Sequence, residues 1–373
     1  MKKFILIILS IIIVAGSCLT YTYADNGSTA KAAVVMDVQT GRVLFSKNPN
    51  ERLPMASTTK IMTTLVAVES GRLNETVKVS NRAAYTEGSS IYLKPGEALT
   101  VEELLYGIML RSGNDAAMAV AEHIGGSIEG FVEMMNQKAK EIGAVNTHFA
   151  NPHGLDNPEH YTTAYDLALI TSYALRNPKF AEIVKTKSKT ITGPPDVNWD
   201  RSMQNKNKML WQYEGGDGVK TGFTKKAGRC LVSSATHDNW QLCSVVLNCG
   251  PMWEESTSLL NYAFNNYSRQ KVIDGSQVYQ KLKVASGKED SVEIKPTDDF
   301  YMPLKNEELG KIITVPALDF NNVAPITKGQ NAGALKIYLD KEYMGAVNLE
   351  YCQSIEAQDP LFHLRRIFQT LFK

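Results

Sequence analysis

Three short motifs in this chain combine a hydroxyl that can attack a carbonyl with amines that can activate it. In chain order they are Ser57-Thr58-Thr59-Lys60, Ser112-Gly113-Asn114 and Lys220-Thr221-Gly222. A serine hydroxyl is a poor nucleophile at neutral pH, so it needs a base for its proton and donors for the oxyanion. If a helix begins near Ser57, Lys60 lies one turn further on the same face, where its amine reaches the hydroxyl. The set predicts acyl transfer through a serine without histidine, metal or cofactor.

A lysine acts as a base only when its pKa is lowered, either by burial or by a nearby cation. Lys220, on a third segment, is a candidate for that second cation. The motifs therefore contain a nucleophile, a candidate base and a reason for the base to be neutral.

Each motif alone has an ordinary structural interpretation, as a helix cap or a turn. Their appearance together and in this order is typical of serine acyl-enzymes, although Gly113 stands where Asp is usual.

The residues around the motifs resemble those of the low-molecular-mass penicillin-binding proteins, which are D-alanyl-D-alanine carboxypeptidases. The similarity runs from about Ala30 to Tyr267 and continues weakly beyond it. It is carried by residues 54–60, 112–117, 151–155, 163–167 and 217–224. The resemblance implies a β-lactamase/transpeptidase-like domain, removal of the terminal D-alanine from peptidoglycan stem peptides, and acylation by β-lactams.

The expected roles begin with the catalytic residues. Ser57 attacks the carbonyl of the penultimate D-alanine, Lys60 accepts the proton of Ser57, and Ser112 relays a proton to the leaving amine. Asn114 holds the substrate amide.

The remaining roles concern the third motif, which we expect on a strand. Lys220 and Thr221 bind the terminal carboxylate, and Gly222 lets the substrate lie along the strand edge. The N–H of Ser57 is a candidate for the oxyanion hole, and the resemblance adds the N–H of Phe223.

Some positions depart from the family pattern or stay outside this scheme. Lys206 stands where relatives often have arginine, and Phe223 where some have histidine, which leaves carboxylate recognition and rate open. The scheme has no role for the side chains of His123, His153, His160 and Asp166, and we interpret them as structural.

Length and composition limit the classes of protein. The 373 residues are enough for one large domain and a smaller one, and 43% apolar with 21% charged residues is typical of globular proteins. A formal net charge of +1 gives no reason to expect nucleic-acid binding.

The N-terminus has the pattern of a secretory signal. Lys2 and Lys3 precede an apolar run over residues 4–15, and small and polar residues lead to Ala24. We expect residues 1–24 to be removed and the enzyme to act at the outer face of the cytoplasmic membrane or in the cell-wall space. The alternative is a membrane anchor, for which the run is short.

The remaining pattern predicts an α+β fold. Residues 32–36 and 43–45 form a hairpin, a helix begins near Ser57, and residues 230–235 and 241–247 form a second hairpin. Further helices are expected at residues 101–110, 115–124, 128–142, 164–175 and 254–267. The order indicates one antiparallel sheet built from both ends of a domain over residues 25–268, with a helical subdomain between.

The C-terminal region is expected to contain two further parts. Short β-branched runs between turns predict a small β domain over residues 270–351, without a catalytic constellation. Residues 360–373 repeat apolar side chains at helical spacing beside Arg365, Arg366 and Lys373. This pattern fits a membrane-surface helix and a terminal helix packed on its own protein equally well. The resemblance favours the membrane, because these carboxypeptidases commonly end in an amphipathic anchor.

Four other functions stay open at this point. A β-lactamase shares the motifs, but no glutamate after Ser112 lies in the Glu-x-x-Leu-Asn context that class A enzymes use. An endopeptidase that cuts crosslinks would use the same site. A penicillin-binding structural or sensing protein would carry the motifs without turnover, and a membrane-binding adaptor would leave most of the chain unexplained.

Overall fold

The computed structural model describes residues 27–193, 199–319, 322–358 and 368. The predicted signal at residues 1–24 lies outside this part of the chain, and so does the predicted C-terminal helix except for Phe368. Within the described part, no helix has both the length and the apolar character needed to cross a bilayer.

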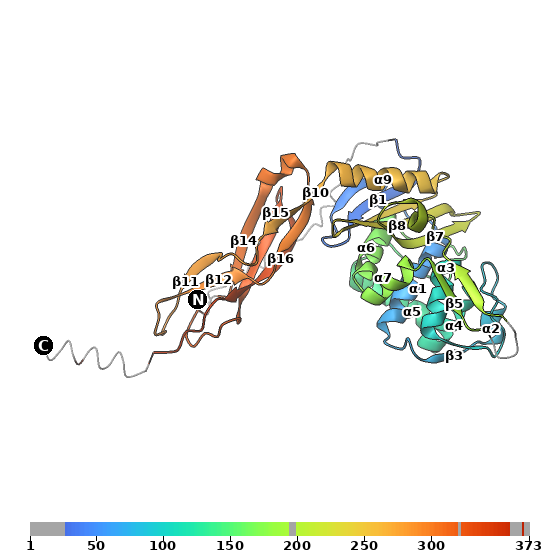
Figure 1. The fold of residues 1–373 in the computed structure, drawn as a ribbon, viewed down its shortest axis with the longest axis horizontal. Helices are drawn as coiled ribbons and strands as arrows, with labels where there is room; N and C mark the ends of the chain where they lie inside the picture. The colour runs from blue at the N-terminus through green and yellow to red at the C-terminus, as the bar shows by residue number, and fades with distance from the viewer. Residues whose placement is uncertain (1–26, 194–198, 320–321, 359–367, 369–373) are drawn as a thin grey trace, which may run out of the picture.

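A five-stranded antiparallel sheet forms the centre of the larger part (Figure 1). Its strand order is β2-β1-β9-β8-β7. The strands are β1 (Ala32–Asp37), β2 (Val43–Lys47), β7 (Gly216–Thr224), β8 (Gly228–His237) and β9 (Trp240–Leu247). Because β1 pairs with β9, the two ends of this region meet in one sheet, as predicted, and β7 is left at an edge.

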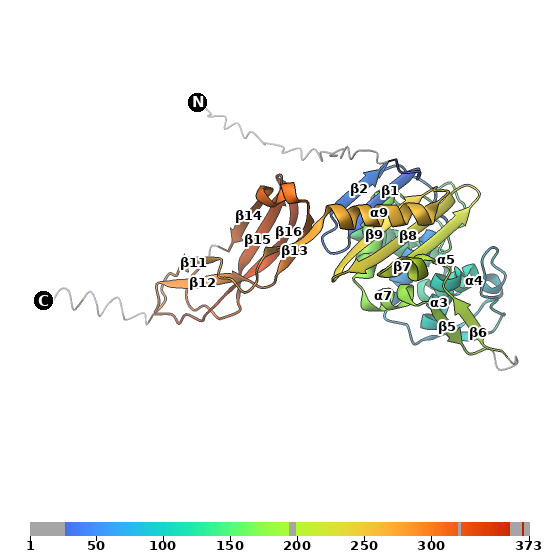
Figure 2. The same cartoon turned by 45° about the horizontal axis from the view of Figure 1, so that its top comes forward.

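Both faces of the sheet are covered. Strand β1 is buried throughout, and its side chains alternate between two apolar clusters: Val34 and Met36 belong to the first, Ala33 and Val35 to the second. The second cluster lies under helix α9 (Met252–Asn266), which crosses one face (Figure 2). A continuous apolar run is the sequence signature of a strand buried on both faces.

The other face carries the helical subdomain. Its helices are α1 (Lys60–Glu69), α3 (Val101–Arg111), α4 (Asn114–Gly125), α5 (Ile128–Ile142), α6 (Ala164–Leu175) and α7 (Pro178–Lys185). The predicted helical ranges match α3, α4, α5 and α6 within a residue or two. Helix α7 was not predicted, and α1 begins later than predicted. A 3₁₀ turn, η1 (Ala56–Thr59), holds Ser57, and the α-helix begins only at Lys60. The predicted helix start at Ser57 is therefore wrong in its detail.

Shorter elements complete this region. They are α2 (Asn81–Ala84), α8 (Met209–Gln212), the strand pair β3 (Thr76–Lys78) and β4 (Ala98–Thr100), and the strand pair β5 (Ser188–Ile191) and β6 (Arg201–Gln204).

The C-terminal region is β-rich and has its own apolar core, in which Ile294, Leu335, Ile337 and Leu349 are buried. The strand order of its larger sheet is β11-β12-β16-β15-β14, and β10 pairs with β13 beside it. The elements are β10 (Ser268–Ile273), β11 (Gln280–Lys283), β12 (Ser291–Pro296), β13 (Phe300–Leu304), the 3₁₀ turn η2 (Asn306–Lys311), β14 (Ile312–Leu318), β15 (Asn331–Leu339) and β16 (Glu342–Tyr351).

Candidate active site

Ser57 and Lys60 lie one helical turn apart, as the first motif predicts. The Lys60 Nζ atom is 3.1 Å from the Ser57 Oγ atom. It also lies 2.7 Å from Asn114 Oδ1 and 2.5 Å from the His153 carbonyl oxygen. Lys60 is fully buried, and these three oxygens are its side-chain hydrogen-bond partners among the described residues.

The turn that holds Ser57 is fixed by its neighbours. Ala56 has a φ of +48°, which a residue with a side chain rarely adopts. The Thr58 hydroxyl donates to the Met55 carbonyl and the Thr59 hydroxyl to the Ala56 carbonyl, so both threonines close the turn with their own side chains. These bonds explain why a tight 3₁₀ turn forms where the apolar spacing alone predicts an α-helix.

A glycine allows the segment of residues 151–155 to lie directly against this turn. Gly154 has a φ of +92°, and a Cβ atom there would come within 2.0 Å of the Ala56 carbonyl oxygen. Only a hydrogen atom fits at this contact. The close approach brings the neighbouring His153 carbonyl to Lys60.

The second motif joins α3 to α4. Ser112 caps the C-terminus of α3 with a φ of +65°, and its buried Oγ atom has no hydrogen-bond partner among the described residues. Asn114 begins α4, where its side-chain oxygen accepts from Lys60 and its amide nitrogen donates to the Glu87 carbonyl at 2.7 Å. The Asn114 amide is thereby held in one orientation.

Burial and charge determine the electrostatics of the two lysines. Burial lowers the pKa of Lys60 well below its usual value, and the ammonium groups of Lys220 and Lys206 lower it further. The Asp115 carboxylate opposes this shift. Burial and the Lys206 charge lower the pKa of Lys220 to about 7. Both amines thus exist in neutral form at a much lower pH than an ordinary lysine.

The third motif lies on the edge strand β7, beside the turn that holds Ser57. Lys220 is buried and its amine donates to the Thr221 carbonyl at 2.9 Å. A Cβ atom at Gly222 would come 3.0 Å from the Ser57 nitrogen and 3.1 Å from the Met55 oxygen. Glycine at this position lets the strand approach the nucleophile closely. Phe223, the next residue, is 65% exposed.

One cavity of about 420 Å³ joins the motifs. Its lining includes Ser57, Ser112, Thr221, Gly222 and Phe223, while the two lysines lie buried beside it. The predicted site residues from distant parts of the sequence therefore converge. Lys206 also lines this cavity.

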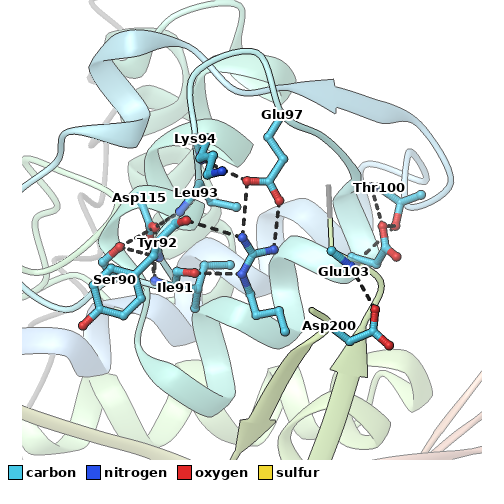
Figure 3. A network of polar contacts seen from close by, with 12 residues as sticks. Ser90, Ile91, Tyr92, Leu93, Lys94, Glu97, Thr100, Glu103, Asp115 and Asp200 are labelled. Atoms are coloured by element: carbon cyan, nitrogen blue, oxygen red, sulfur yellow. Dashed lines mark hydrogen bonds and ion pairs between the residues drawn. The ribbon is translucent and has the colours of Figure 1, made fainter. Parts of the chain in front are cut away.

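A polar network holds residues 90–97, the rim segment, which directly follows Ser89 in the cavity lining (Figure 3). The buried Asp115 carboxylate accepts from the backbone nitrogens of Ile91 and Leu93, both at 3.1 Å. On the other side of the same segment, Arg201 donates to the Ile91 carbonyl at 2.8 Å and pairs with buried Glu97 at 2.9 Å. The segment is thus held from α4 and from β6.

Sequence reasoning missed several of these supporting groups. Nothing in the motifs indicated Arg201 and Glu97, and the Glu87 and His153 carbonyls are backbone groups that residue types cannot reveal. The sequence offered one signal for this network. Asp115 directly follows Asn114, and an acid in the first turn of a helix can accept backbone N–H groups.

Two histidines near the site are occupied elsewhere. The Thr59 hydroxyl and His160 Nε2 share a hydrogen bond of 2.7 Å, and His160 Nδ1 accepts from the Ala150 nitrogen. His153 Nδ1 accepts from the Leu155 nitrogen at 3.2 Å. Burial lowers the pKa of His160 to about 4 and that of His153 to about 3. Over the described part of the chain, no three His, Cys, Asp or Glu side chains gather in a way that could hold a metal ion.

Comparison with known proteins decides the family. The family model of D-alanyl-D-alanine carboxypeptidases, Peptidase_S11, matches residues 20–250. The chain belongs to this family. A second model, the C-terminal domain of penicillin-binding protein 5, matches residues 267–357 of the carboxypeptidase.

Individual relatives agree with the family models. The carboxypeptidase is 38% identical to D-alanyl-D-alanine carboxypeptidase DacF of Bacillus subtilis, over 84% of this chain and 83% of the relative. It is 32% identical to DacA of Haemophilus influenzae, over 88% and 85% of the two chains.

Solved structures give the same result for the fold. The crystal structure of penicillin-binding protein 5 from Haemophilus influenzae matches with a TM-score of 0.73 and 32% identity, covering 88% of this chain and 98% of the other. A peptidoglycan synthesis regulatory factor (PBP3) from Streptococcus pneumoniae matches with a TM-score of 0.76 and 26% identity, covering 88% and 100%. These findings confirm the predicted α+β class, the serine-type hydrolase and the carboxypeptidase activity on D-Ala-D-Ala termini.

Proposed function

We propose that this carboxypeptidase removes the terminal D-alanine from stem pentapeptides through an acyl-enzyme on Ser57. The observation that carries the proposal is the 3.1 Å contact between the Ser57 hydroxyl and a fully buried amine, that of Lys60.

The partners of Lys60 are those that a neutral amine needs in order to act as a base. Such an amine has two N–H groups and one lone pair. Asn114 Oδ1 and the His153 carbonyl can accept the two N–H groups, which leaves the lone pair for the Ser57 proton. The lowered pKa of Lys60 favours this neutral form of the amine.

The attack then forms a bond from Ser57 Oγ to the carbonyl carbon of the penultimate D-alanine. The N–H groups of Ser57 and Phe223 stabilise the oxyanion. Ser112 passes the proton to the leaving amine of the terminal D-alanine, and its otherwise unpartnered hydroxyl is free for this relay. Water then hydrolyses the ester and regenerates Ser57.

The edge strand β7 is the surface on which the substrate lies. Its open edge can pair with an extended peptide in the manner of an added strand. Lys220, Thr221 and Lys206 bind the terminal carboxylate, Gly222 leaves room for the substrate backbone, and Asn114 holds the substrate amide.

Replacing Ser57 by alanine tests the nucleophile. We expect the Ser57→Ala variant to lose covalent labelling by a fluorescent penicillin and to release D-alanine from a D-Ala-D-Ala pentapeptide on the order of 10⁶-fold more slowly. Mass measurement of the peptide product gives the second readout.

The matched control is Ser258→Ala, which removes an exposed hydroxyl on α9 and should label and turn over as the parent does. Labelling of Ser57→Ala would assign the nucleophile to another residue. Normal labelling of the parent without release of D-alanine would favour a binding or sensing protein, and rapid turnover of the penicillin would favour a β-lactamase.

We also propose that the enzyme is exported and acts at the outer face of the cytoplasmic membrane, with residues 25–268 as the catalytic domain and residues 270–351 as a separate β domain. The composition of residues 1–24 supports export. The apolar side chains and the three cations of residues 360–373 support attachment to an anionic membrane surface.

A further inference from the structure

The cavity that contains Ser57 continues past the edge strand to residues that the reaction does not use. Beyond Phe223 its lining is formed by Arg229, Met252 and Trp253. The charged residues of the whole lining are Lys206 and Arg229, both cations, and no acidic side chain contributes to it. Lys206 is already assigned to the terminal carboxylate of the substrate, so Arg229 has no assigned ligand.

Strand pairing places Arg229 beside the reacting part of β7. Phe223 and Arg229 are direct partners in the β7–β8 register, so their side chains lie next to each other on one face of the sheet. On that face the first turn of α9 contributes Met252 and Trp253. An arginine thus lies at the end of a partly apolar surface.

Arg229 is available to bind an anion. It is exposed, and within the described part of the chain its side chain makes one long hydrogen bond, 3.5 Å from a guanidinium nitrogen to the Gly250 carbonyl. No ion pair joins it to an acid within the described residues. Glu255, a nearby acid in the first turn of α9, is held by the Thr29 hydroxyl at 2.8 Å.

The register of a bound peptide can be derived from the strand geometry. A substrate whose C-terminal carboxylate lies at Thr221 and whose chain runs antiparallel to β7 advances about 3.4 Å per residue. The third residue from its C-terminus therefore lies opposite Phe223. In an antiparallel pair, opposite residues direct their side chains to the same face. The side chain of this third residue extends towards Arg229, Met252 and Trp253.

We propose that Phe223, Arg229, Met252 and Trp253 form a subsite for the residue that precedes D-Ala-D-Ala, and that the subsite selects a side chain ending in a carboxylate. The apolar groups contact the aliphatic part of that side chain, and the Arg229 guanidinium pairs with its end. This inference rests on the proposed function, because it uses the substrate orientation assumed there.

Three peptides that differ only at this residue test the subsite: N-acetylated Glu-D-Ala-D-Ala, Gln-D-Ala-D-Ala and Lys-D-Ala-D-Ala. We expect kcat/KM for the Glu peptide to exceed that for the Gln peptide by about fivefold, the size of an exposed ion pair, with the Lys peptide slowest. In Arg229→Gln the Glu/Gln ratio should fall to about one. Titration with a fluorescent penicillin counts the active enzyme in each preparation.

The matched control is Lys226→Gln, which removes an exposed cation in the β7–β8 connection outside the cavity and should keep the ratio of the parent. High salt should reduce the ratio in the parent, because it screens exposed charges. A parent ratio near one, or a ratio that Arg229→Gln leaves unchanged, would overturn the subsite. Failure to release D-alanine from all three peptides would instead overturn the proposed function.

Discussion

At the scale of single residues, the proposed mechanism makes the reaction of Ser57 depend on the protonation of Lys60. Burial is the largest cause of its lowered pKa, and the Lys220 ammonium is the second. The chain thus uses a cation from a distant strand to keep the base neutral. The same arrangement is unfavourable for folding, because burying amines costs free energy.

Removing the Lys220 charge should shift the pH dependence of acylation. A neighbouring cation disfavours the protonated form of Lys60, so Lys220→Met should raise the pKa of Lys60 and move the acid limb of the profile to higher pH. The measurement is the acylation rate with a fluorescent penicillin as a function of pH. A slower variant with an unmoved acid limb would show that another group controls the profile.

The same variant has a predictable effect on stability. In the unfolded chain Lys220 has its ordinary pKa of 10.5, whereas in the folded protein it is about 7. Between these values the unfolded state binds more protons, so the free energy of unfolding of the parent rises with pH through this window. The free energy of unfolding, measured with urea at pH 7 and pH 9, should increase less between these pH values for Lys220→Met than for the parent.

At the scale of elements, the rim of the site depends on two anchors from different parts of the chain. Asp115 in the first turn of α4 accepts the backbone N–H groups of residues 91 and 93, and Arg201 on β6 binds the Ile91 carbonyl. The neighbouring Asn114 nitrogen donates to the Ser89 carbonyl at 2.6 Å. The rim segment and the second motif are thus positioned together.

Breaking the Arg201–Glu97 pair should be costly. Arg201→Met leaves a buried carboxylate unpaired and should lower the free energy of unfolding by about 3–5 kcal/mol. Adding Glu97→Gln to the same chain should restore part of this loss, because no unpaired charge remains. Urea unfolding measures both effects, and penicillin acylation should slow in the single variant as the rim loosens.

An exposed pair in the same subdomain provides the control. Arg82 and Glu129 are 3.9 Å apart with side chains 62% and 77% exposed, so Arg82→Met should cost no more than about 1 kcal/mol. If Arg201→Met/Glu97→Gln were as unstable as Arg201→Met, the unpaired charge would not be the cause of the loss.

Elements with strong periodicity were predictable from sequence, and elements fixed by local bonds were less so. The helices at residues 101–111 and 128–142 follow the apolar spacing almost to the residue. Helix α7 was missed although Asn177 caps it and Pro178 begins it, both recognisable signals. The strands β10 and β13 were also missed, since Pro303 interrupts the strand pattern of β13.

In the candidate site, the residues with reactive side chains could be predicted from sequence, whereas the contributions of the backbone could not. Ser57, Lys60 and the other motif residues could be chosen because hydroxyls and amines have definite roles. The positive φ of Ala56 could not be predicted, since alanine rarely adopts it. The His153 carbonyl could not be chosen either, because every residue has such a group and only the fold selects one.

At the scale of the whole molecule, Arg42 links the two regions. It pairs with Glu308 at 2.5 Å, donates to the Pro303 carbonyl, and lies over the Tyr267 ring at 5.5 Å. Every predicted site residue precedes Tyr267. We therefore expect the chemistry to depend on the first region alone.

A truncation series tests this division. A chain of residues 25–268 should label with a fluorescent penicillin as the mature chain does, at a somewhat lower melting temperature because the Arg42 contacts are lost. A chain of residues 25–358 should also label, but it should no longer sediment with vesicles of anionic lipid. Loss of labelling in the first chain, or retained sedimentation of the second, would contradict the proposed division or the proposed membrane attachment respectively.

The hydrogen atom of Gly154 that faces the Ala56 carbonyl has an evolutionary consequence. Any larger residue would displace the loop, and with it the oxygen that orients the general base. In the proposed mechanism a β-lactam and the natural peptide use the same base, so bacteria under drug selection would gain no gradual route to resistance at this position. A change there would abolish the drug's reaction and the enzyme's own in one step.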